Sequence, residues 1–400
     1  MKIQLAVLFG GKSVEHEISI ISAIQAIKHL DTEKYDIIPI YMTKSQEMYT
    51  GEHIADIEAY RDINALLKKS IRVVMINDND RTYVIGHPFT RKFKKFKKEI
   101  DVVLPIVHGT NVEDGTLQGF IKTLGVPFAG CSVYSSAIGM DKHAMKLILK
   151  GCGIPVLDDM VFTSQEYLNE PEDIYNRIIS GIGFPVIVKP VNLGSSVGIT
   201  KANDETELKD ALDLAFSFAG RVLVERAITQ LREINCSVIG DADEAEASEC
   251  EEPLNASTIL SYEDKYMGSA KSKSSDSSGM ASLSRQIPAN ISKELRSEIQ
   301  ALAVKTFKAL ECNGISRIDF MIDGEQNKVY VNEINTIPGS LAFYLWEPLG
   351  ITYKSLLDKL ISLALKRQRD EKNISYAFDT NVLSMCSNDS LRGAKGKLKV

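Results

Sequence analysis

The 400-residue sequence lacks several features that mark specialised classes of protein. It has one tryptophan and six cysteines, and no two cysteines form a Cys-x-x-Cys pair, so neither a zinc site nor a disulfide framework is indicated. No apolar run approaches the roughly 18–20 residues that span a bilayer. The net charge of -6 gives no bulk attraction to nucleic acid or anionic lipid. These absences predict a cytoplasmic protein with no membrane or nucleic-acid partner, in which local positive charge holds any anionic ligand.

The composition itself is that of a globular protein, with 44% hydrophobic and 25% charged residues. The length exceeds what one hydrophobic core serves, so we expect several domains. Strand and helix patterns alternate over residues 1–141, which predicts a parallel α/β domain. A mixed α+β unit is predicted over 142–230 and another over 231–369. The latter contains a serine-rich stretch at 268–284, and a flexible loop of this kind inside a domain is often a lid. The bounds 261–287 of the predicted lid come from the family resemblance described below. Residues 370–400 are predicted to be a tail, partly or wholly disordered.

A basic run at residues 91–98 contains Phe93 and Phe96 among its lysines. Charges interleaved with aromatic residues can indicate nucleic-acid binding. Two phenylalanines three residues apart also fit a helix that packs one apolar stripe and exposes its lysines. We favour the helix.

The strongest chemical signal is a predicted hairpin, with strands near 316–322 and 328–335 joined by an Asp-Gly turn. Because strand side chains alternate with period two, Arg317 and Asp319 share one face. A hairpin closing near Gln326 pairs Asp319 opposite Glu333, with Asn335 on the same face as Glu333. Two carboxylates and an amide oxygen suit Mg²⁺. For the hairpin alone, a salt bridge on an exposed face is an equally good interpretation.

A second signal is the segment 194–198, Gly-Ser-Ser-Val-Gly. It matches the Gly-x-Ser-x-Gly pattern in which Ser196 would be a nucleophile. All six histidines precede Ser196, and the residues that follow it are typical of a strand rather than a helix, so the hydrolase interpretation is weak. We favour a loop whose backbone N–H groups and hydroxyls face phosphate oxygens, with Lys189 supplying positive charge.

Three weaker signals surround these segments. A strand at 221–225 joins the second unit to the third, where a linker backbone could contact adenine and Glu233 could accept from ribose hydroxyls. Glu15 follows the first strand and either binds a substrate ammonium or stabilises the dipole of the next helix. His108 follows another strand, where a lone histidine is more often structural.

Together and in this order, these segments resemble the D-alanine–D-alanine ligase family of the ATP-grasp superfamily, over residues 1–366. The resemblance implies an ATP-grasp fold, with α/β and α+β parts. It implies that ATP is bound at its phosphates and adenosine by Lys142, Lys189, Ser195, Ser196, Glu225, the backbone of Arg226 and Ile228, Glu233 and Lys265. It also implies two Mg²⁺ or Mn²⁺ ions, with the ligands Asp319, Glu333 and Asn335.

The resemblance further implies a reaction. The carboxylate of a first D-alanine attacks the ATP γ-phosphate to give an acylphosphate and ADP. The amine of a second D-alanine then attacks the acylphosphate, and the dipeptide serves peptidoglycan synthesis. The implied catalytic residues are Glu15, Ser195, Tyr266, Arg317 and Gly339, and the implied substrate residues are Glu15, His108, Tyr344 and Leu345. A homodimer is implied as well.

The sequence departs from the family pattern at the site of the second substrate. Tyr344 stands where the family commonly has a serine, which leaves the acceptor open. Two alternatives therefore remain beside D-alanine ligation. One is a ligase with D-serine or another acceptor, and the other is a non-catalytic nucleotide-binding relative.

Overall fold

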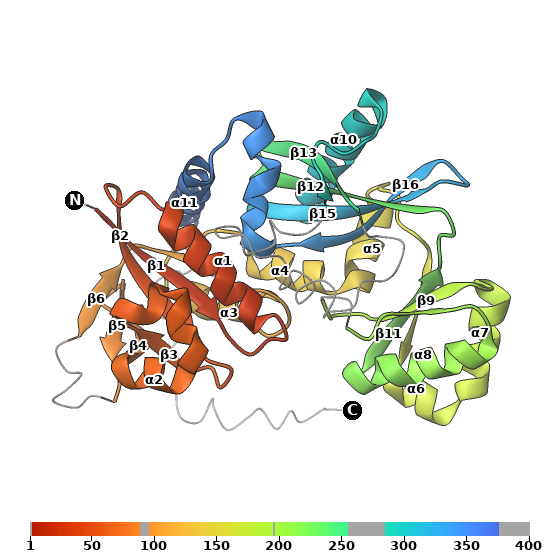
Figure 1. Cartoon of the computed structure of the whole chain (residues 1–400), viewed down its shortest axis with the longest axis horizontal. Helices are drawn as coiled ribbons and strands as arrows, with labels where there is room; N and C mark the ends of the chain where they lie inside the picture. The colour runs from red at the N-terminus through yellow and green to blue at the C-terminus, as the bar shows by residue number, and fades with distance from the viewer. Residues whose placement is uncertain (1, 89–95, 195–196, 255–284, 376–400) are drawn as a thin grey trace, which may run out of the picture.

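The computed structural model describes residues 2–88, 96–194, 197–254 and 285–375. They form three sheets, called A, B and C here in chain order, with helices packed against them (Figure 1). The predicted site residues Ser195, Ser196, Lys265 and Tyr266 lie outside the described residues, as does most of the predicted lid. Within the ranges described, no helix has the length and apolar character needed to cross a membrane.

Sheet A is mixed, with strand order β6-β5-β4-β3-β2-β1-β7. β1 runs parallel to β2 and β7, as predicted, but the other neighbours are antiparallel. Asn79 and Asp80 alone join β4 to β5, both with positive φ, and so short a connection allows only antiparallel pairing. The strands are β1 (Ile3–Gly10), β2 (Tyr35–Met42), β3 (Met48–Thr50), β4 (Ile71–Asp78), β5 (Arg81–Gly86), β6 (Lys97–Ile100) and β7 (Val102–Ile106). The helices of this region are α1 (His16–His29), η1 (Glu52–Ala55), η2 (Ile57–Asp62), α2 (Ile63–Lys69), α3 (Thr116–Thr123) and α4 (Val133–Met140).

The helix predicted over the basic run is wrong where the structure describes it. Lys97 and Lys98 begin β6, which pairs with β5 at the edge of sheet A. The Lys97 ammonium lies 3.9 Å from the centroid of the Tyr83 ring. An edge strand leaves one side unpaired, and charged side chains there discourage pairing with another chain. Residues 89–95 are outside the described ranges.

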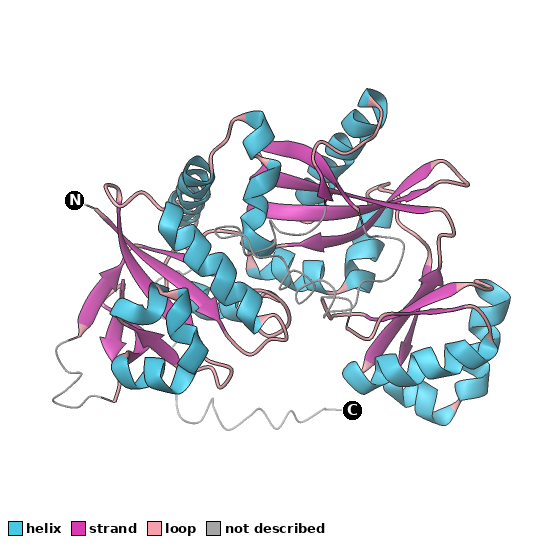
Figure 2. Cartoon of the chain, in the orientation of Figure 1, coloured by secondary structure: helices cyan, strands magenta, loops and turns pink. Residues whose placement is uncertain are grey.

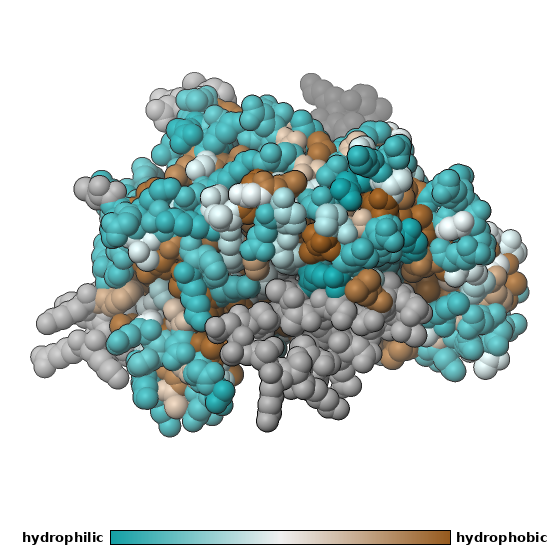
Figure 3. Space-filling model, turned by 45° about the horizontal axis from the view of Figure 1, so that its top comes forward, coloured by the Kyte–Doolittle hydropathy of each residue, from teal (hydrophilic) through white to brown (hydrophobic). Residues whose placement is uncertain are grey.

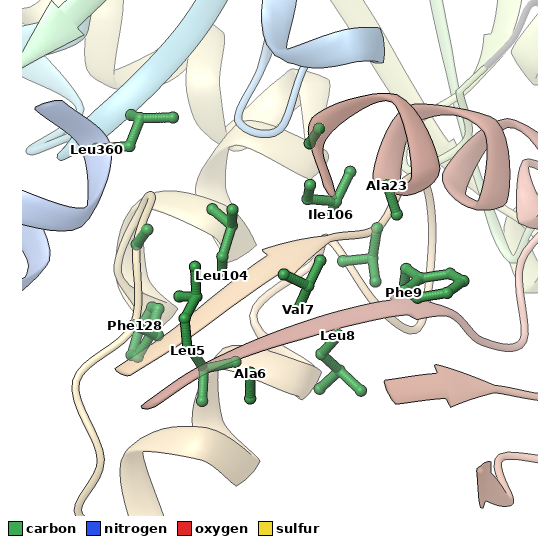
Figure 4. Close-up of a cluster of buried hydrophobic side chains, with 14 of the residues drawn as sticks. Leu5, Ala6, Val7, Leu8, Phe9, Ala23, Leu104, Ile106, Phe128 and Leu360 are labelled. Atoms are coloured by element: carbon green, nitrogen blue, oxygen red, sulfur yellow. The ribbon is translucent and has the colours of Figure 1, made fainter. Parts of the chain in front are cut away.

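The core of sheet A forms around β1, whose residues 5–9 are fully buried. The labelled side chains in Figure 4 come from β1 and β7, and from Ala23, Phe128 and Leu360 of the segments around them. Leu360 belongs to α11 (Tyr353–Lys372), near the C-terminal end of the described chain. The same buried cluster includes Leu341 and Trp346. The first and last parts of the chain therefore share one core.

Sheet B is antiparallel, with strand order β10-β9-β11-β8. The predicted pairing of the strands on either side of the Gly/Ser loop is confirmed, since β9 pairs with β10. Its helices lie together on one face (Figure 2). The elements are β8 (Asp159–Thr163), α6 (Ser164–Asn169), α7 (Pro171–Gly181), β9 (Val186–Pro190), β10 (Thr200–Ala202), α8 (Glu205–Phe218) and β11 (Arg221–Arg226).

Sheet C has strand order β14-β13-β12-β15-β16 and is antiparallel. The predicted hairpin is confirmed: Asp319 lies opposite Glu333, and Arg317 lies opposite Asn335. Helix α5 (Lys142–Gly151) contributes Met145 and Leu149 to the core beneath this sheet. The other elements are β12 (Leu231–Gly240), β13 (Ala245–Pro253), β14 (Arg285–Gln286), α10 (Lys293–Ala309), β15 (Gly314–Asp323), β16 (Lys328–Asn335), η5 (Gly339–Leu345) and η6 (Glu347–Leu349).

Candidate active site

A cavity of about 70 Å³ lies where the loops of sheet A meet the β15–β16 hairpin. In the view of Figure 3 the molecular surface is largely hydrophilic, with smaller hydrophobic patches. The cavity brings together seven of the residues predicted from sequence: Glu15, His108, Lys142, Arg317, Glu333, Asn335 and Gly339. Residues that are far apart in the chain therefore converge at one place.

The hairpin places the predicted metal ligands around Arg317. Its Nε and Nη2 donate to the two carboxylate oxygens of Asp319, each at 2.7 Å. The Asn335 side-chain amide donates to Asp319 Oδ2 at 3.1 Å. Burial raises the pKa of the Asp319 carboxyl, and the Arg317 guanidinium opposes this rise. The site combines the predicted metal set with the predicted salt bridge, which the sequence presented as alternatives.

The oxygen donors of this set fit a hard divalent cation. Asp319 and Glu333 are opposite one another on adjacent strands, and Asn335 follows on the same face. Across the described ranges, no three His, Cys, Asp or Glu side chains cluster as a metal site. Two carboxylates and an amide suit Mg²⁺, which commonly completes its shell with substrate phosphates and water.

Two predicted lysines reach this region from different elements. Lys142 Nζ, at the start of α5, donates to the Leu193 carbonyl at 2.7 Å and lies 3.4 Å from Glu333 Oε2. Lys189 Nζ, on β9, donates to Glu225 Oε1 at 2.5 Å and to Asn332 Oδ1 at 3.3 Å. Lys142 therefore connects the Gly/Ser loop to the hairpin, and Lys189 connects sheet B to sheet C.

Glu225 carries a second buried lysine partner that the sequence analysis missed. Lys146 is fully buried and also donates to the Glu225 carboxylate. Burial alone would raise the pKa of Glu225, but Lys189 and Lys146 outweigh it and lower that pKa to about 2. A signal was available, because Lys146 lies one helical turn after Lys142 and so on the same face of α5.

The four residues predicted at the adenosine lie near the junction of sheets B and C. Glu225 and Arg226 end β11, and Ile228 follows in the connection to β12. The Arg226 side chain pairs with Asp323 at 2.6 Å, which is compatible with the backbone role expected for it. Glu233 on β12 lies opposite Met321, so it faces the same side of sheet C as Asp319. None of the four is among the residues that line the cavity.

Glu15 lies at the N-cap position of α1, without a side-chain capping hydrogen bond. Its carboxylate approaches two glycine-containing loops. A Cβ atom added at Gly194 would lie 3.0 Å from Glu15 Oε2, and one at Gly109 would lie 2.8 Å from it. Glycine at these positions leaves room for the carboxylate beside the cavity, which favours the substrate interpretation of Glu15.

His108 lines the cavity but is held by structural hydrogen bonds. Its Nδ1 is 2.8 Å from the Ile337 carbonyl, and its Nε2 is 3.1 Å from Ser22 Oγ. Burial lowers the pKa of this imidazole. His108 therefore has the structural hydrogen bonds favoured from sequence and also lines the cavity.

Glu113 is a further residue that the sequence analysis did not select. It accepts from the Gly109 and Ile337 N–H groups, each at 2.9 Å. It thereby joins the loop after β7 to the loop after β16. Burial raises the pKa of Glu113 to about 7, although its hydrogen bonds favour the carboxylate. The sequence shows that Glu113 follows a predicted strand. It does not show that Glu113 contacts Ile337, which is more than 200 residues away in the chain.

Tyr344 and Leu345 end η5 and do not line the cavity. Leu345 is fully buried in the hydrophobic core. The Tyr344 hydroxyl donates to Glu251 at 3.3 Å. Just before Tyr344, the three residues 340–342 have φ between 49° and 53°, a left-handed turn that costs energy for residues other than glycine. The turn directs the end of η5 towards sheet C.

The sequence matches two family models that together span this architecture. The D-ala D-ala ligase N-terminus matches residues 4–131, and the D-ala D-ala ligase C-terminus matches residues 148–362. The chain belongs to the D-alanine–D-alanine ligase family. The family, the fold class and the ligase class predicted from sequence are thereby confirmed.

Similar proteins extend over nearly the whole chain. The D-alanine–D-alanine ligase of Thermosipho melanesiensis is 40% identical, covering 96% of this chain and 99% of its own. That of Caldicellulosiruptor bescii is 41% identical, covering 94% and 99%. The solved D-alanine-D-alanine ligase of Coxiella burnetii has a TM-score of 0.78 at 30% identity, covering 98% and 99%. The VanG D-Ala:D-Ser ligase of Enterococcus faecalis has a TM-score of 0.74 at 32% identity, covering 91% and 100%.

Proposed function

We propose that this ligase joins D-alanine to a second D-alanine, forms ADP and phosphate, and supplies peptidoglycan synthesis. The observation that carries the proposal is that Glu15, Arg317, Glu333, Asn335 and Gly339 line one cavity, with Asp319 hydrogen-bonded to Arg317 and Asn335 beside it. An acid for an ammonium, donors for an oxyanion and ligands for a metal are the groups that a carboxylate–amine ligation needs.

In the first step, Glu15 binds the ammonium of the first D-alanine and so orients its carboxylate for attack on the γ-phosphate of ATP. Lys142 and Lys189 bind the phosphates, and we assign Ser195, Ser196 and Lys265 to the same task. Glu225, the backbone of Arg226 and Ile228, and Glu233 bind the adenosine. Positioning and charge neutralisation supply most of the catalysis in phosphoryl transfer.

Asp319, Glu333 and Asn335 would hold two Mg²⁺ or Mn²⁺ ions, which neutralise charge on the phosphoryl group when bound. Arg317 already balances the Asp319 carboxylate. This ion pair opposes the effect of burial on the pKa of Asp319 and favours the ionised carboxylate, which is the form that binds a cation.

In the second step, the acceptor amine attacks the carbonyl of D-alanyl phosphate, and phosphate leaves. Arg317 and the Gly339 N–H donate to the oxyanion of the tetrahedral intermediate. The site must exclude water, because water would hydrolyse the acylphosphate. We assign Tyr266 and Ser195 to the hydrogen-bonded group around Glu15, and Tyr344 and Leu345 to the site of the second substrate.

The remaining assignments are also proposals: three domains at 1–141, 142–230 and 231–369, a lid at 261–287, a tail at 370–400, a cytoplasmic location, a homodimer, and no nucleic-acid or membrane partner. Helix α5, which begins at Lys142, packs its Met145 and Leu149 into the core of sheet C and not into that of sheet A, and this supports a first boundary before the helix.

The function is tested by ADP release from ATP and Mg²⁺ with D-alanine alone, with product masses recorded. A D-alanyl-D-alanine mass is expected. D-Serine is the second candidate acceptor, because Tyr344 replaces the usual serine and the D-Ala:D-Ser ligase is 32% identical. A mixed dipeptide formed only when D-serine is added would move the assignment to that acceptor. Nucleotide binding without ADP release under any condition would favour a non-catalytic relative.

Asp319→Asn tests the metal set. The substitution keeps the size of the side chain but removes the charge that a cation and Arg317 both require. We expect a fall in kcat of at least roughly 100-fold, equivalent to about 2.7 kcal/mol, with an unchanged thermal midpoint or a small loss. The matched control is Asp243→Asn, a carboxylate whose side chain is 79% exposed. Equal activity in the two variants would contradict the assignment.

A further inference from the structure

A row of polar side chains crosses sheet C and extends beyond the predicted metal set. Glu251 on β13 lies opposite Asn235 on β12, which lies opposite Asp319 on β15. Directly opposed residues share a face, so Glu251 faces the same side of the sheet as Asp319 and Glu333. Two strand spacings separate Glu251 from Asp319, roughly 10 Å. The row therefore continues from the hairpin towards β14.

Glu251 organises a buried cluster at the far end of this row. Its Oε1 accepts from the Asn235 amide at 2.9 Å and from the Tyr344 hydroxyl at 3.3 Å. Its Oε2 accepts from Arg285 Nη1 at 3.0 Å. The Arg285 guanidinium carbon lies 4.1 Å from the centroid of the Tyr344 ring. The guanidinium is therefore held by both an acid and an aromatic face, which fixes its orientation before any ligand binds.

The acceptor amino acid brings a carboxylate into this region, and a buried carboxylate requires a cation. Lys142 and Lys189 contact Glu333 and Glu225, on the side of the nucleotide. Arg317 forms two hydrogen bonds with Asp319. Arg317 lies on β15, with β16 on one side of it and β14, which carries Arg285, towards the other edge of the sheet. The Arg285 side chain is 10% exposed. Its five N–H donors allow it to bind a second carboxylate while it contacts Glu251.

We propose that Arg285, held in place by Glu251 and Tyr344, binds the carboxylate of the second substrate. The inference rests on the proposed ligation and adds a residue to it. It also gives Tyr344 a role: its hydroxyl turns to Glu251, and its ring supports the guanidinium. Arg285 would then set the preference for acceptors that carry a carboxylate.

The test uses D-alaninamide, which has an amine but no carboxylate and so can act only as an acceptor. Its amine attacks D-alanyl phosphate, a C–N bond forms, the bond from the acyl carbon to phosphate breaks, and a proton is released. With D-alanine and D-alaninamide both present, the ratio of D-alanyl-D-alanine to D-alanyl-D-alaninamide gives the relative kcat/KM of the two acceptors. The intrinsic reactivity of the two amines cancels when variants are compared.

We expect Arg285→Gln to shift this product ratio towards the amide by roughly 10- to 100-fold, the size of a lost charge-assisted hydrogen-bond pair. Glu251→Gln should shift it in the same direction by less, because it weakens the hold on Arg285. The matched control is Arg296→Gln. Arg296 pairs at 3.3 Å with Glu249, which lies on β13 as Glu251 does. Its ratio should equal that of the unmodified protein.

A folded Arg285→Gln protein with an unchanged product ratio would overturn the inference. If that variant does not fold, an unchanged ratio in Glu251→Gln would overturn it instead. Failure of the proposed function would give a different result from failure of this inference, because the unmodified protein would then release no ADP and form neither product. In that case the inference would fall as well.

Discussion

Glu225 is a buried carboxylate whose charge depends on Lys189 and Lys146. Its pKa in the folded protein, about 2, is below its ordinary value of 4.5. The lower value means that the ionised carboxylate favours the folded state. The stabilisation is present above pH 4.5 and is lost as the pH falls towards 2. The junction of sheets B and C thus contains a charged cluster that acid destroys, at the place where we propose that the nucleotide binds.

Lys146→Met tests this cluster. Removing one of two cations raises the pKa of Glu225, so the loss of stability in acid should begin at a higher pH. At pH 7 the effect should be small, because a neutral Lys189–Glu225 pair remains and methionine fills the space of lysine. Thermal midpoints measured from pH 7 to pH 3 check both statements.

The control for this series is Lys305→Met, which replaces an exposed lysine whose ammonium donates to the Gly153 carbonyl at 3.3 Å. It should leave the acid profile unchanged. A Lys146→Met profile that coincides with that of the control would show that Glu225 does not depend on Lys146 for its ionisation.

At the scale of elements, the loop between β9 and β10 places Gly194 against Glu15. Gly194→Ala would put a methyl group 3.0 Å from the carboxylate that we assign to the first substrate's ammonium. We expect the KM for the first D-alanine to rise roughly threefold to tenfold, which corresponds to about 1 kcal/mol, while kcat changes less. Gly151→Ala, where nothing lies within 4 Å of the added atom, is the control. Equal KM values for D-alanine in the two variants would show that Gly194 does not contribute to the site of the first substrate.

Local patterns predicted the elements whose partners are close in sequence. The pairing of Asp319 with Glu333 followed from an Asp-Gly turn and the alternation of strand side chains. Helix α1 and β1, β2 and β7 were found from hydrophobic periodicity. By contrast, the basic run gave a helical pattern, and only pairing with β5 shows that Lys97 and Lys98 lie in an edge strand. Periodicity in a short charged segment does not determine its structure when a neighbouring strand supplies the hydrogen bonds.

The prediction of site residues also succeeded where local patterns sufficed and failed where the contacts are distant in sequence. Glu15 and Arg317 were identified from local patterns and Lys142 from the family resemblance, but Glu113 and the cluster of Glu251 and Arg285 were not identified. Glu113 acts through the Ile337 N–H, and Glu251 contacts Arg285 across the segment 255–284. Each of these contacts depends on the register between strands or loops that are distant in sequence, which no local pattern contains.

At the scale of the whole molecule, the buried hydrophobic residues of the described ranges form three clusters. One joins sheet A to η5 and α11, a second lies between sheet C, α5 and α10, and a third lies between sheet B and its helices. Ile239 and Ile315 of sheet C belong to the first cluster, so sheets A and C share apolar contacts. Sheet B contacts sheet C through polar pairs such as Arg226–Asp323 and Lys189–Asn332. Polar contacts of this kind couple units more weakly than a shared apolar core does.

This arrangement predicts two unfolding transitions in calorimetry, one for sheet B and one for sheets A and C together. Leu360→Ala removes a side chain that is 1% exposed in the first cluster, and Leu212→Ala removes a fully buried one in the third. Each should cost about 2–5 kcal/mol and lower one transition by several degrees while leaving the other in place. If both variants instead shift a single common transition, the three sheets unfold as one unit. The position of Lys189 would then depend on the folding of the hairpin, whose Asn332 it contacts.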